Sequence, residues 1–379
     1  MRISDPLIGA TALLLGILTV CGCGDESSPP APPPVPMLER VAEEVRVRHQ
    51  LPGLAVAAFT EDALDLAVTG TRRQDGADTI EERDLFHIGS QTKAMLATTV
   101  AKLVEEGVVE WSLSLAEAFP ELATTMTSAY REVTLAQLLQ HRSGMPGLDE
   151  YEQLLQLPAF PGTEAEQRQA FATWILSQPP ASPVGTYVYS NAGYTVAAAI
   201  IERRTGQSWL SLLTSRLLDP LAIRAVVGWP LDHGADQPCG HTIDPDHPGS
   251  GRLLPIEPSL GRLPAVVAPA GDLSMDIADY GRFAQLHLRA LNHHGAILAD
   301  STFQRLHQPI GDYAMGWSVL SEGENRVLFH DGSAGTFFAF AALYPHQGRG
   351  FVVLINADTP TVDQAVVDLI TGVLRAEGE

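Results

Sequence analysis

The chain has 379 residues and a formal net charge of −21, because 45 acidic residues stand against 24 basic ones. This balance excludes a protein that binds nucleic acid by neutralising phosphates. With 45% hydrophobic and 18% charged residues, the composition is that of a globular protein with a large core. It excludes a mainly disordered chain or a coiled coil.

The N-terminal segment has the pattern of a secretory leader. An apolar run over residues 7–20 is too short for a comfortable membrane span and ends at small residues and cysteine. The sequence Val20-Cys21-Gly22-Cys23 resembles a bacterial lipobox, which implies lipid attachment at Cys23. We therefore expect a lipoprotein-type signal peptide over residues 1–22 and a Pro-rich linker over 23–36.

This leader places the protein outside the cytoplasm, in the bacterial cell envelope, with membrane contact only through the lipid on Cys23. An ordinary cleaved signal, which would give a periplasmic or secreted protein, is one alternative. An uncleaved anchor is the other. Cys239 is the only cysteine beyond residue 23, so the folded part can hold no internal disulfide.

Residues 37–379 have the patterns of one folded domain. Apolar spacing predicts helices over residues 37–50, Ala94–Glu106, Leu135–Gln140, Ala192–Thr205 and Val362–Arg375. Runs of β-forming residues predict strands over Leu54–Phe59, Leu64–Thr69, Tyr313–Leu320, Arg326–His330, Phe337–Tyr344 and Gly350–Asn356. Strands near both ends predict an α/β (α+β) fold with one mainly antiparallel sheet formed from both termini and flanked by helices. A helical region, roughly residues 101–300, is inserted into it.

The strongest chemical candidate lies in Phe86–Lys93, where an apolar stretch runs into a glycine, a serine and a helix. Ser90 would open that helix near the positive end of its dipole, and the i, i+3 spacing puts the Lys93 amine on the same face. Lys93 and Lys102 are the only lysines in the chain. Arginine cannot release its proton, so a retained lysine indicates a need for an amine.

A neutral Lys93 amine would take the Ser90 proton, provided that burial or a cationic neighbour lowers its pKa from about 10.4. The alternative at this point is a capping serine followed by a solvated lysine.

Two further segments carry polar groups at the ends of predicted elements. Tyr189 and Asn191 stand where a loop meets an apolar helix, so Tyr189 could relay a proton and Asn191 could bind an amide or Lys93. His330 and Gly332 end a predicted strand, where small residues let backbone N–H groups approach a substrate. Taken singly, such a tyrosine is usually a core or surface aromatic, and such a histidine is more often a loop residue.

Together, in this order, the three segments resemble the signature of serine β-lactamases and penicillin-binding proteins, S-x-x-K, S-D-N and K-T-G. Here they read Ser90-Gln91-Thr92-Lys93, Tyr189-Ser190-Asn191 and His330-Asp331-Gly332. The last two have the forms typical of the class C-like, D-aminopeptidase-like and esterase branch. The resemblance spans roughly residues 38–375 and includes Leu138–Pro146, Tyr189–Tyr194 and Pro269–Leu273. It implies a β-lactamase/DD-peptidase-like fold.

The resemblance also implies a serine hydrolase with no cofactor and no metal. Ser90 would be the acylated nucleophile, and Lys93 and Tyr189 would act as base and acid; which of them loses its proton first stays open. The expected partner is a small ester, a D-amino-acid-containing amide or peptide, or a β-lactam. The alternatives are a true β-lactamase and a non-catalytic receptor of the same fold.

The remaining matched positions would bind the substrate. By the resemblance, Asn191 would position Lys93 and the substrate, with His330 and Gly332 on the substrate-binding strand. The backbone N–H groups of Ser90 and Ser333 would form the oxyanion hole, which stabilises charge that appears only in the transition state.

Other chemistries fit the sequence less well. No serine lies in a G-x-S-x-G elbow, which disfavours an α/β-hydrolase. Residues 232–247 contain several histidines and aspartates together with Cys239, but their spacing matches none of the usual zinc patterns, so we expect no metal there.

His330 stands where the better-known β-lactamases and peptidases of the family have lysine. A histidine with an ordinary pKa near 6.5 is mostly neutral at pH 7.5 and attracts a substrate carboxylate weakly. We therefore expect neutral short-chain esters to be better substrates than penicillins. We also expect carboxylate-bearing substrates to bind more tightly as pH falls toward 6 and His330 gains its proton.

Overall fold

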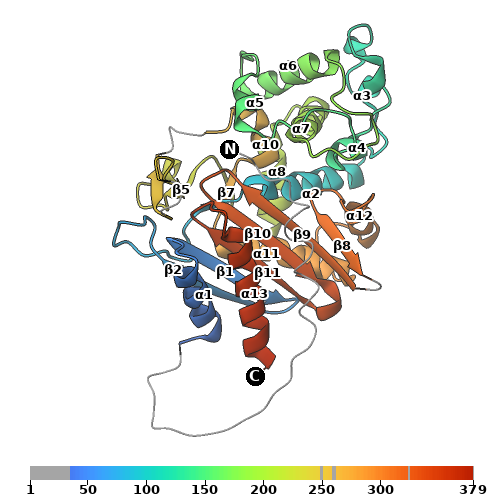
Figure 1. Ribbon diagram of the computed structural model, residues 1–379. Coiled ribbons are helices and arrows are strands. Elements are labelled where there is room, and N and C mark those ends of the chain that lie inside the picture. Colours follow the sequence, from blue (N-terminus) through green and yellow to red (C-terminus); the bar gives the residue numbers. More distant parts are fainter. Residues whose placement is uncertain (1–34, 248–250, 258–261, 323–324, 379) are drawn as a thin grey trace, which may run out of the picture.

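The computed structural model describes residues 35–247, 251–257, 262–322 and 325–378 (Figure 1). The predicted signal peptide, the lipid-attachment residue Cys23 and nearly all of the linker lie outside these residues. Within the described ranges, no helix is long and apolar enough to cross a membrane.

The central sheet combines strands from the two ends of the chain, in the order β2-β1-β11-β10-β9-β8. Its strands are β1 (Gly53–Thr60), β2 (Leu64–Gly70), β8 (Ser318–Glu322), β9 (Asn325–Ser333), β10 (Phe338–Tyr344) and β11 (Arg349–Ile355). Every neighbouring pair is antiparallel, and Leu54 in β1 lies opposite Ile355 in β11. The predicted fold class, a mainly antiparallel sheet built from both termini, is confirmed.

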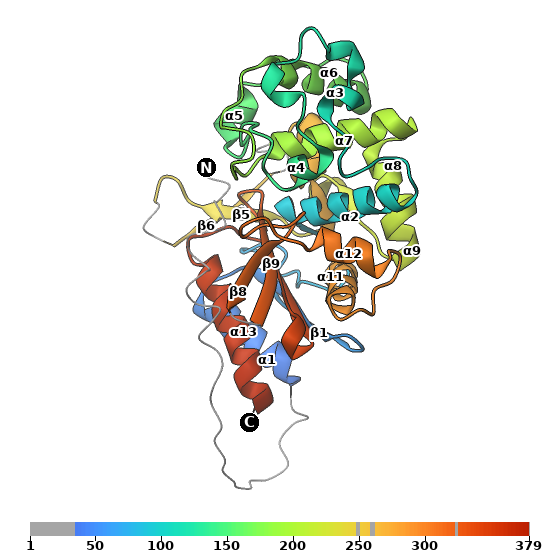
Figure 2. The ribbon, with the colours of Figure 1, turned by 90° about the vertical axis from the view of Figure 1, so that its right-hand side faces the viewer.

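Helices cover both faces of this sheet. Figure 2 shows α1 (Met37–Arg48) and α13 (Val362–Gly378) on one side and α11 (Ile277–Leu291) on the other. The buried residues of α1 recur at helical spacing and form one apolar stripe: Leu38, Val41, Ala42 and Val45. They share a core with α13 and with the side chains of β1, β10 and β11 that face them.

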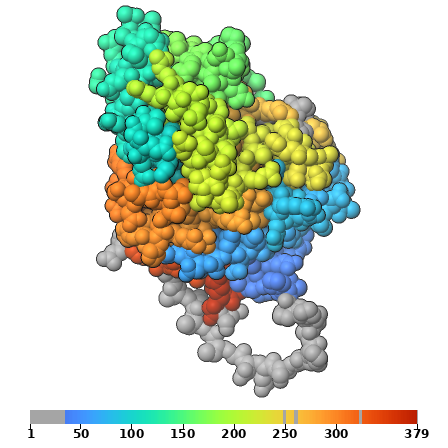
Figure 3. Space-filling view, turned by 180° about the vertical axis from the view of Figure 1, so that it is seen from behind, coloured from blue at the N-terminus to red at the C-terminus, as the bar shows by residue number. Residues whose placement is uncertain are grey.

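Most other helices lie between β2 and β8 in the sequence. They are α2 (Thr92–Glu105), α3 (Leu115–Ala118), α4 (Leu135–Leu139), α5 (Tyr151–Leu155), α6 (Glu164–Ser177), α7 (Asn191–Thr205), α8 (Trp209–Leu213), α9 (Asp219–Leu221), α10 (Ala268–Gly271) and α12 (Asp300–Leu306). Short strands join them: β3 (Phe86–His87), β4 (Val226–Val227), β5 (Gly240–Ile243), β6 (Leu253–Ile256) and β7 (Leu273–Met275). From behind, teal and yellow-green parts of the helical region lie directly against the orange segment that includes α11 and α12 (Figure 3).

One predicted strand is shorter than its sequence pattern. The pattern predicts a strand over Tyr313–Leu320, but β8 begins only at Ser318. Gly316 adopts φ +83°, and a Cβ there would lie 2.5 Å from the Cα of Ala94. The chain therefore turns against α2 at this point and cannot continue as an extended strand.

Candidate active site

Ser90 lies in a single 3-10 turn, Gly89–Gln91, directly before α2. The sequence predicts that Ser90 opens the helix, whereas the α-helix begins at Thr92, whose hydroxyl donates to Gly89 O at 2.7 Å. The i, i+3 spacing still brings Lys93 back to Ser90 one turn later. Both side chains are buried, that of Lys93 completely.

Two glycines let strand β9 run against this turn. Gly89 has φ +51°, and a Cβ on it would lie 2.6 Å from Ser333 N. A Cβ on Gly332 would lie 2.1 Å from Ile88 O and 3.0 Å from Ser90 N. Only residues without a side chain fit such an approach. It places Ser333 N against Gly89 and Ser90 N against Gly332, so the two backbone nitrogens expected to form the oxyanion hole lie on either side of this contact.

Three oxygen atoms surround the Lys93 amine. Its Nζ lies 2.9 Å from Ser90 Oγ, 2.6 Å from Asn191 Oδ1 and 2.7 Å from Ala270 O. A neutral amine has two N–H groups and one lone pair. As an ammonium, Lys93 has three N–H groups and donates to all three oxygens. Once it is neutral, the two carbonyl oxygens, which can only accept, take its two N–H groups, and its lone pair faces the Ser90 hydroxyl. This is the geometry of a general base.

Burial separates the acid and base properties of Lys93 and Tyr189. It lowers the pKa of Lys93 well below the ordinary value, against the opposing charges of Asp331 and Asp149. It raises the pKa of Tyr189 well above the ordinary value, and a hydrogen bond with Ser90 offsets part of this rise. Lys93 Nζ lies 4.6 Å from the centre of the Tyr189 ring. Of the two groups, the amine is the one that reaches its basic form more readily.

A loop before α5 holds the start of α7 and with it Asn191. The Asn191 backbone N–H donates to Gly147 O at 2.7 Å, and its side-chain amide donates to Leu148 O at 2.8 Å. The Ser190 hydroxyl caps the helix and donates to Pro146 O at 2.7 Å. The Asn191 side-chain oxygen is thereby directed at Lys93.

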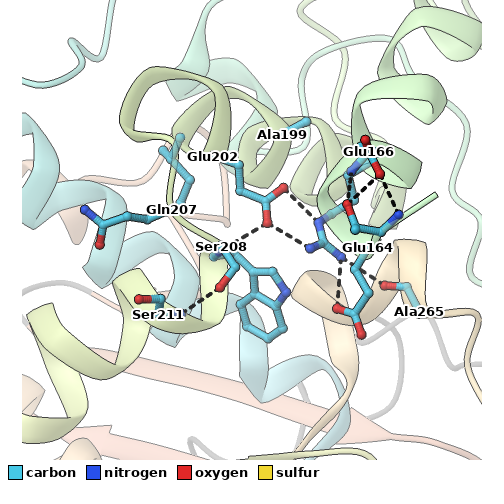
Figure 4. A network of polar contacts seen from close by, with 12 residues as sticks. Glu164, Glu166, Ala199, Glu202, Gln207, Ser208, Ser211 and Ala265 are labelled. Carbon is cyan, nitrogen blue, oxygen red and sulfur yellow. Dashed lines mark hydrogen bonds and ion pairs between the residues drawn. The ribbon is translucent and has the colours of Figure 1, made fainter.

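A buried ion pair connects the two elements that supply carbonyl oxygens to Lys93. Arg168 on α6 donates to both oxygens of Glu202 on α7, at 2.9 and 2.8 Å. Its third nitrogen donates at 3.2 Å to Ala265 O, in the turn that leads into α10. Figure 4 shows Glu202, Glu164 and Ala265 converging on this guanidinium. The pair fixes α7, which begins at Asn191, relative to the segment that leads to Ala270.

His330 is buried beside Tyr313, whose hydroxyl lies 3.1 Å from His330 Nε2. Burial and the charge of Lys93 lower the pKa of His330 to about 3. The expectation that His330 gains a proton as pH falls toward 6 is therefore wrong. The ordinary pKa on which it rested belongs to an exposed ring, and exposure cannot be read from the motif.

Carboxyl groups approach the site from the same strand and from the loop before α13. The Ser333 hydroxyl donates to the carboxylate of Asp358. Burial raises the pKa of Asp331 to about 7 and that of Asp358 to about 6. Neither residue has a role in the sequence analysis, although Asp331 stands inside the third motif.

In residues 232–247, the stretch considered for zinc, the ring of His241 is occupied by main-chain contacts. His241 Nδ1 lies 2.7 Å from Asn356 O, and its Nε2 accepts from Gln74 N at 3.1 Å. In the part of the chain that the structure describes, no three His, Cys, Asp or Glu side chains are grouped so as to hold a metal ion.

Comparison with known proteins gives a family and several relatives. The family model described as Beta-lactamase matches residues 38–372. Penicillin-binding protein 4 of Amycolatopsis lactamdurans is 26% identical over 335 residues, which cover 84% of this chain and 84% of that protein. Unguisins hydrolase ungD of Aspergillus violaceofuscus is 25% identical over 352 residues, which cover 84% of this chain and 60% of that protein.

Solved structures share the fold. A class C β-lactamase from Rhodobacter sphaeroides superposes with a TM-score of 0.68 at 20% identity, covering 89% of this chain and 99% of that one. D-amino acid amidase from Ochrobactrum anthropi superposes with a TM-score of 0.69 at 18% identity, covering 90% and 98%. At these identities the likeness establishes the architecture, and the chemistry is left to the site itself.

Proposed function

The chain belongs to the β-lactamase family, as its three motifs predict, and on that premise we propose that it is a serine hydrolase acting through an acyl-enzyme on Ser90. The observation that carries the proposal is the hydrogen-bond arrangement of Lys93. Lys93 Nζ lies 2.9 Å from Ser90 Oγ, and once the amine is neutral the Asn191 and Ala270 carbonyl oxygens take its two N–H groups, so its lone pair faces the Ser90 hydroxyl.

Each proton in this reaction has an acceptor. As Ser90 Oγ attacks the substrate carbonyl carbon, its proton passes to Lys93 Nζ, and the N–H groups of Ser90 and Ser333 hold the oxyanion. When the bond to the leaving group breaks, Tyr189 gives that group a proton and regains one from Lys93. Water then attacks the Ser90 ester through the same groups in reverse, which releases the acid and restores the serine.

We propose small neutral esters and D-amino-acid amides as the substrate class, with a true β-lactamase as the alternative. His330 is neutral, and the carboxyl groups of Asp331 and Asp149 oppose the approach of a substrate carboxylate. Relatives named as a D-amino acid amidase and as an unguisins hydrolase are consistent with such substrates.

The nucleophile is tested by covalent labelling. A fluorophosphonate should add once, on the peptide that contains Ser90, and Ser90→Ala should hydrolyse no ester above background. Ser143→Ala is the matched control and should label normally, because Ser143 Oγ accepts from the backbone N–H of Met145 and does not face Lys93 through a hydrogen bond among the described residues. Labelling of Ser143 or Ser333 would overturn the assignment.

The substrate class is tested by kcat/KM for a neutral short-chain ester, a D-amino-acid amide and a cephalosporin. We expect the neutral ester to be turned over fastest at pH 7.5. We also expect His330→Lys to raise kcat/KM for the cephalosporin, because it adds the missing cation. Efficient cephalosporin hydrolysis by the unaltered protein would move the assignment to a β-lactamase.

We also propose that the protein is anchored in the cell envelope by a lipid on Cys23. Cys23→Ala should then move it from the membrane pellet to the soluble extracytoplasmic fraction. A native N-terminus at any residue other than Cys23 would contradict the proposal.

A further inference from the structure

His141 lies just after α4 and is bonded to the residues on both sides of Tyr189. Val188 N donates to the carbonyl oxygen of His141 at 2.9 Å, and Ser190 N donates to His141 Nδ1 at 3.0 Å. One residue therefore fixes the backbone before and after the phenol. Neither bond involves Ser90 or Lys93.

The His141 ring also packs on the Tyr189 ring. The two ring centres lie 4.4 Å apart, with planes tilted by 39°. Three further tyrosine rings surround the imidazole, with centres 4.7 to 6.0 Å away: Tyr313, Tyr194 and Tyr187. Backbone and ring contacts together leave the Tyr189 phenol little freedom to move away from Ser90.

The hydrogen bond from Ser190 specifies the form of the ring. Because Nδ1 accepts, the proton of the neutral imidazole must be on Nε2. Nε2 is buried and has no hydrogen-bond partner among the described residues. Burial lowers the pKa of His141 well below its ordinary value. A protonated ring would carry a donor at Nδ1 facing the Ser190 N–H, and the bond would be lost.

The backbone of His141 is part of the same arrangement. Its φ is +58°, a left-handed conformation that asparagine and glycine adopt more readily than most residues. This turn sends the chain into the loop whose carbonyl oxygens at Pro146 and Gly147 hold Ser190 and Asn191. His141 thus begins a continuous series of contacts along the segment that carries Tyr189.

We propose that His141 is a positioning residue for Tyr189, holding the phenol where it can protonate the leaving group. The inference rests on the proposed function, since it assumes that Tyr189 acts in proton transfer. His141 acts through Tyr189 and touches neither the nucleophile nor its base.

The test compares leaving groups. A p-nitrophenolate leaves without a proton, whereas an alkoxide needs one. His141→Gly keeps the backbone conformation and removes both the ring and the Nδ1 acceptor. Its kcat should fall at least tenfold more for an ethyl ester than for the p-nitrophenyl ester of the same acid, with similar KM values. His141→Asn supplies an amide oxygen to Ser190 N and tolerates the positive φ, so it should restore most of the ethyl-ester rate.

Two controls separate positioning from general damage. His346→Asn, on an exposed histidine, should leave both rates unchanged. In a Tyr189→Phe background, His141→Gly should add little further loss, because the phenol that it positions is gone. Equal losses for both esters, additive effects with Tyr189→Phe, or no rescue by asparagine would overturn the proposal.

A measurement on the unaltered protein keeps the proposal testable if His141→Gly does not fold. Nitrogen-15 NMR of labelled histidine should show His141 with Nε2 protonated and Nδ1 bare near pH 7; the opposite tautomer would overturn it. If Ser90 takes no fluorophosphonate, the proposed function fails. If Ser90 is labelled and Tyr189→Phe loses ethyl-ester activity while His141→Gly does not, only the role of His141 fails.

Discussion

Two basic side chains are completely buried in neighbouring parts of the molecule, Lys93 on α2 and Arg168 on α6, and their surroundings differ. Arg168 makes two hydrogen bonds to the carboxylate of Glu202. Lys93 contacts a hydroxyl, a side-chain amide oxygen and a backbone carbonyl, all of them neutral.

This difference in partners explains why one buried cation has a structural role and the other a chemical one. A buried guanidinium beside a carboxylate keeps its charge and joins two helices. A buried amine whose hydrogen-bond partners are neutral oxygens lacks an adjacent carboxylate, and the more distant charges of Asp331 and Asp149 do not offset its lost hydration, so its pKa falls and it becomes a base. The identity of the partner, more than the depth of burial, decides which role a buried cation takes.

The largest expected effect comes from replacing the amine by a group that cannot act as a base. Lys93→Arg should lower the acylation rate by about 10³-fold or more, since arginine keeps its proton. Stopped-flow acylation by a chromogenic ester measures this. Lys102→Arg is the matched control and should be nearly silent, because Lys102 is partly exposed and donates to Ile297 O and Glu105. Equal effects of the two changes would contradict the role of Lys93.

The next largest effect concerns Arg168, the buried cation that is paired with a carboxylate. Arg168→Leu leaves the Glu202 carboxylate buried without its partner, so the free energy of unfolding should fall by about 3–5 kcal/mol. The double variant with Glu202→Leu should regain much of that loss, because no charge remains buried. Urea unfolding measures both. Arg203→Leu removes an exposed ion pair with Glu121 and should cost about 1 kcal/mol or less; a loss as large as that of Arg168→Leu would show that burial is not the cause.

Two buried histidines extend the comparison to a third type of basic side chain. Nδ1 of His287 lies 2.8 Å from Nε2 of His307. Burial lowers the pKa of His287 to about 3 and that of His307 well below the ordinary value. Both are neutral when folded, whereas in the unfolded chain they take up protons near pH 6.5. Their contribution to stability is complete above that pH and is lost as pH falls below it, by about 1.4 kcal/mol per pH unit for each ring.

Urea unfolding from pH 7.5 to 5 should show this loss, and His287→Phe should reduce its slope by the share of one ring. An unchanged slope in that variant would mean that other groups cause the acid sensitivity.

The smallest effect removes a charge that acts on Lys93 from a distance. Above pH 7, where the Asp331 carboxyl group is ionised, it raises the pKa of Lys93, so Asp331→Asn should lower that pKa. More of the amine is then neutral at a given pH, and the acid limb of kcat/KM for a neutral ester should move to lower pH by less than about one unit. Asp149→Asn should shift it in the same direction. A shift to higher pH would contradict the assignment of the acid limb to Lys93.

The sequence was sufficient to predict the fold class, because strand patterns are local properties. It also indicated that Lys93, Tyr189 and Asn191 belong with Ser90, because the three motifs in this order resemble the signature of one family. Ala270 contributes only a backbone carbonyl to Lys93, and a carbonyl has no sequence signature. Arg168 and Glu202 are 34 positions apart, and nothing in either helix indicates that they meet. The neutral state of His330 depends on its burial, which appears only once the chain has folded.

For the same reason, the sequence did not indicate a role for His141. The segment Leu138–Pro146 is similar to one typical of the family, but its spacing gives no reason for a histidine at that place. The reason lies in two backbone N–H groups from residues 188 and 190, which α7 and its preceding loop bring to it.

Because Gly89 and Gly332 meet main chain to main chain, the part of the site between them offers no side chain to exchange. A Cβ at Gly332 would lie 2.1 Å from Ile88 O, so even alanine would push β9 away from the Ser90 turn and separate the two amides. A mutant library designed to broaden substrate range should therefore leave Gly89 and Gly332 unchanged. The half-exposed side chain of Asp149, whose charge acts on Lys93, is not part of this main-chain contact and can be varied without moving the two amides.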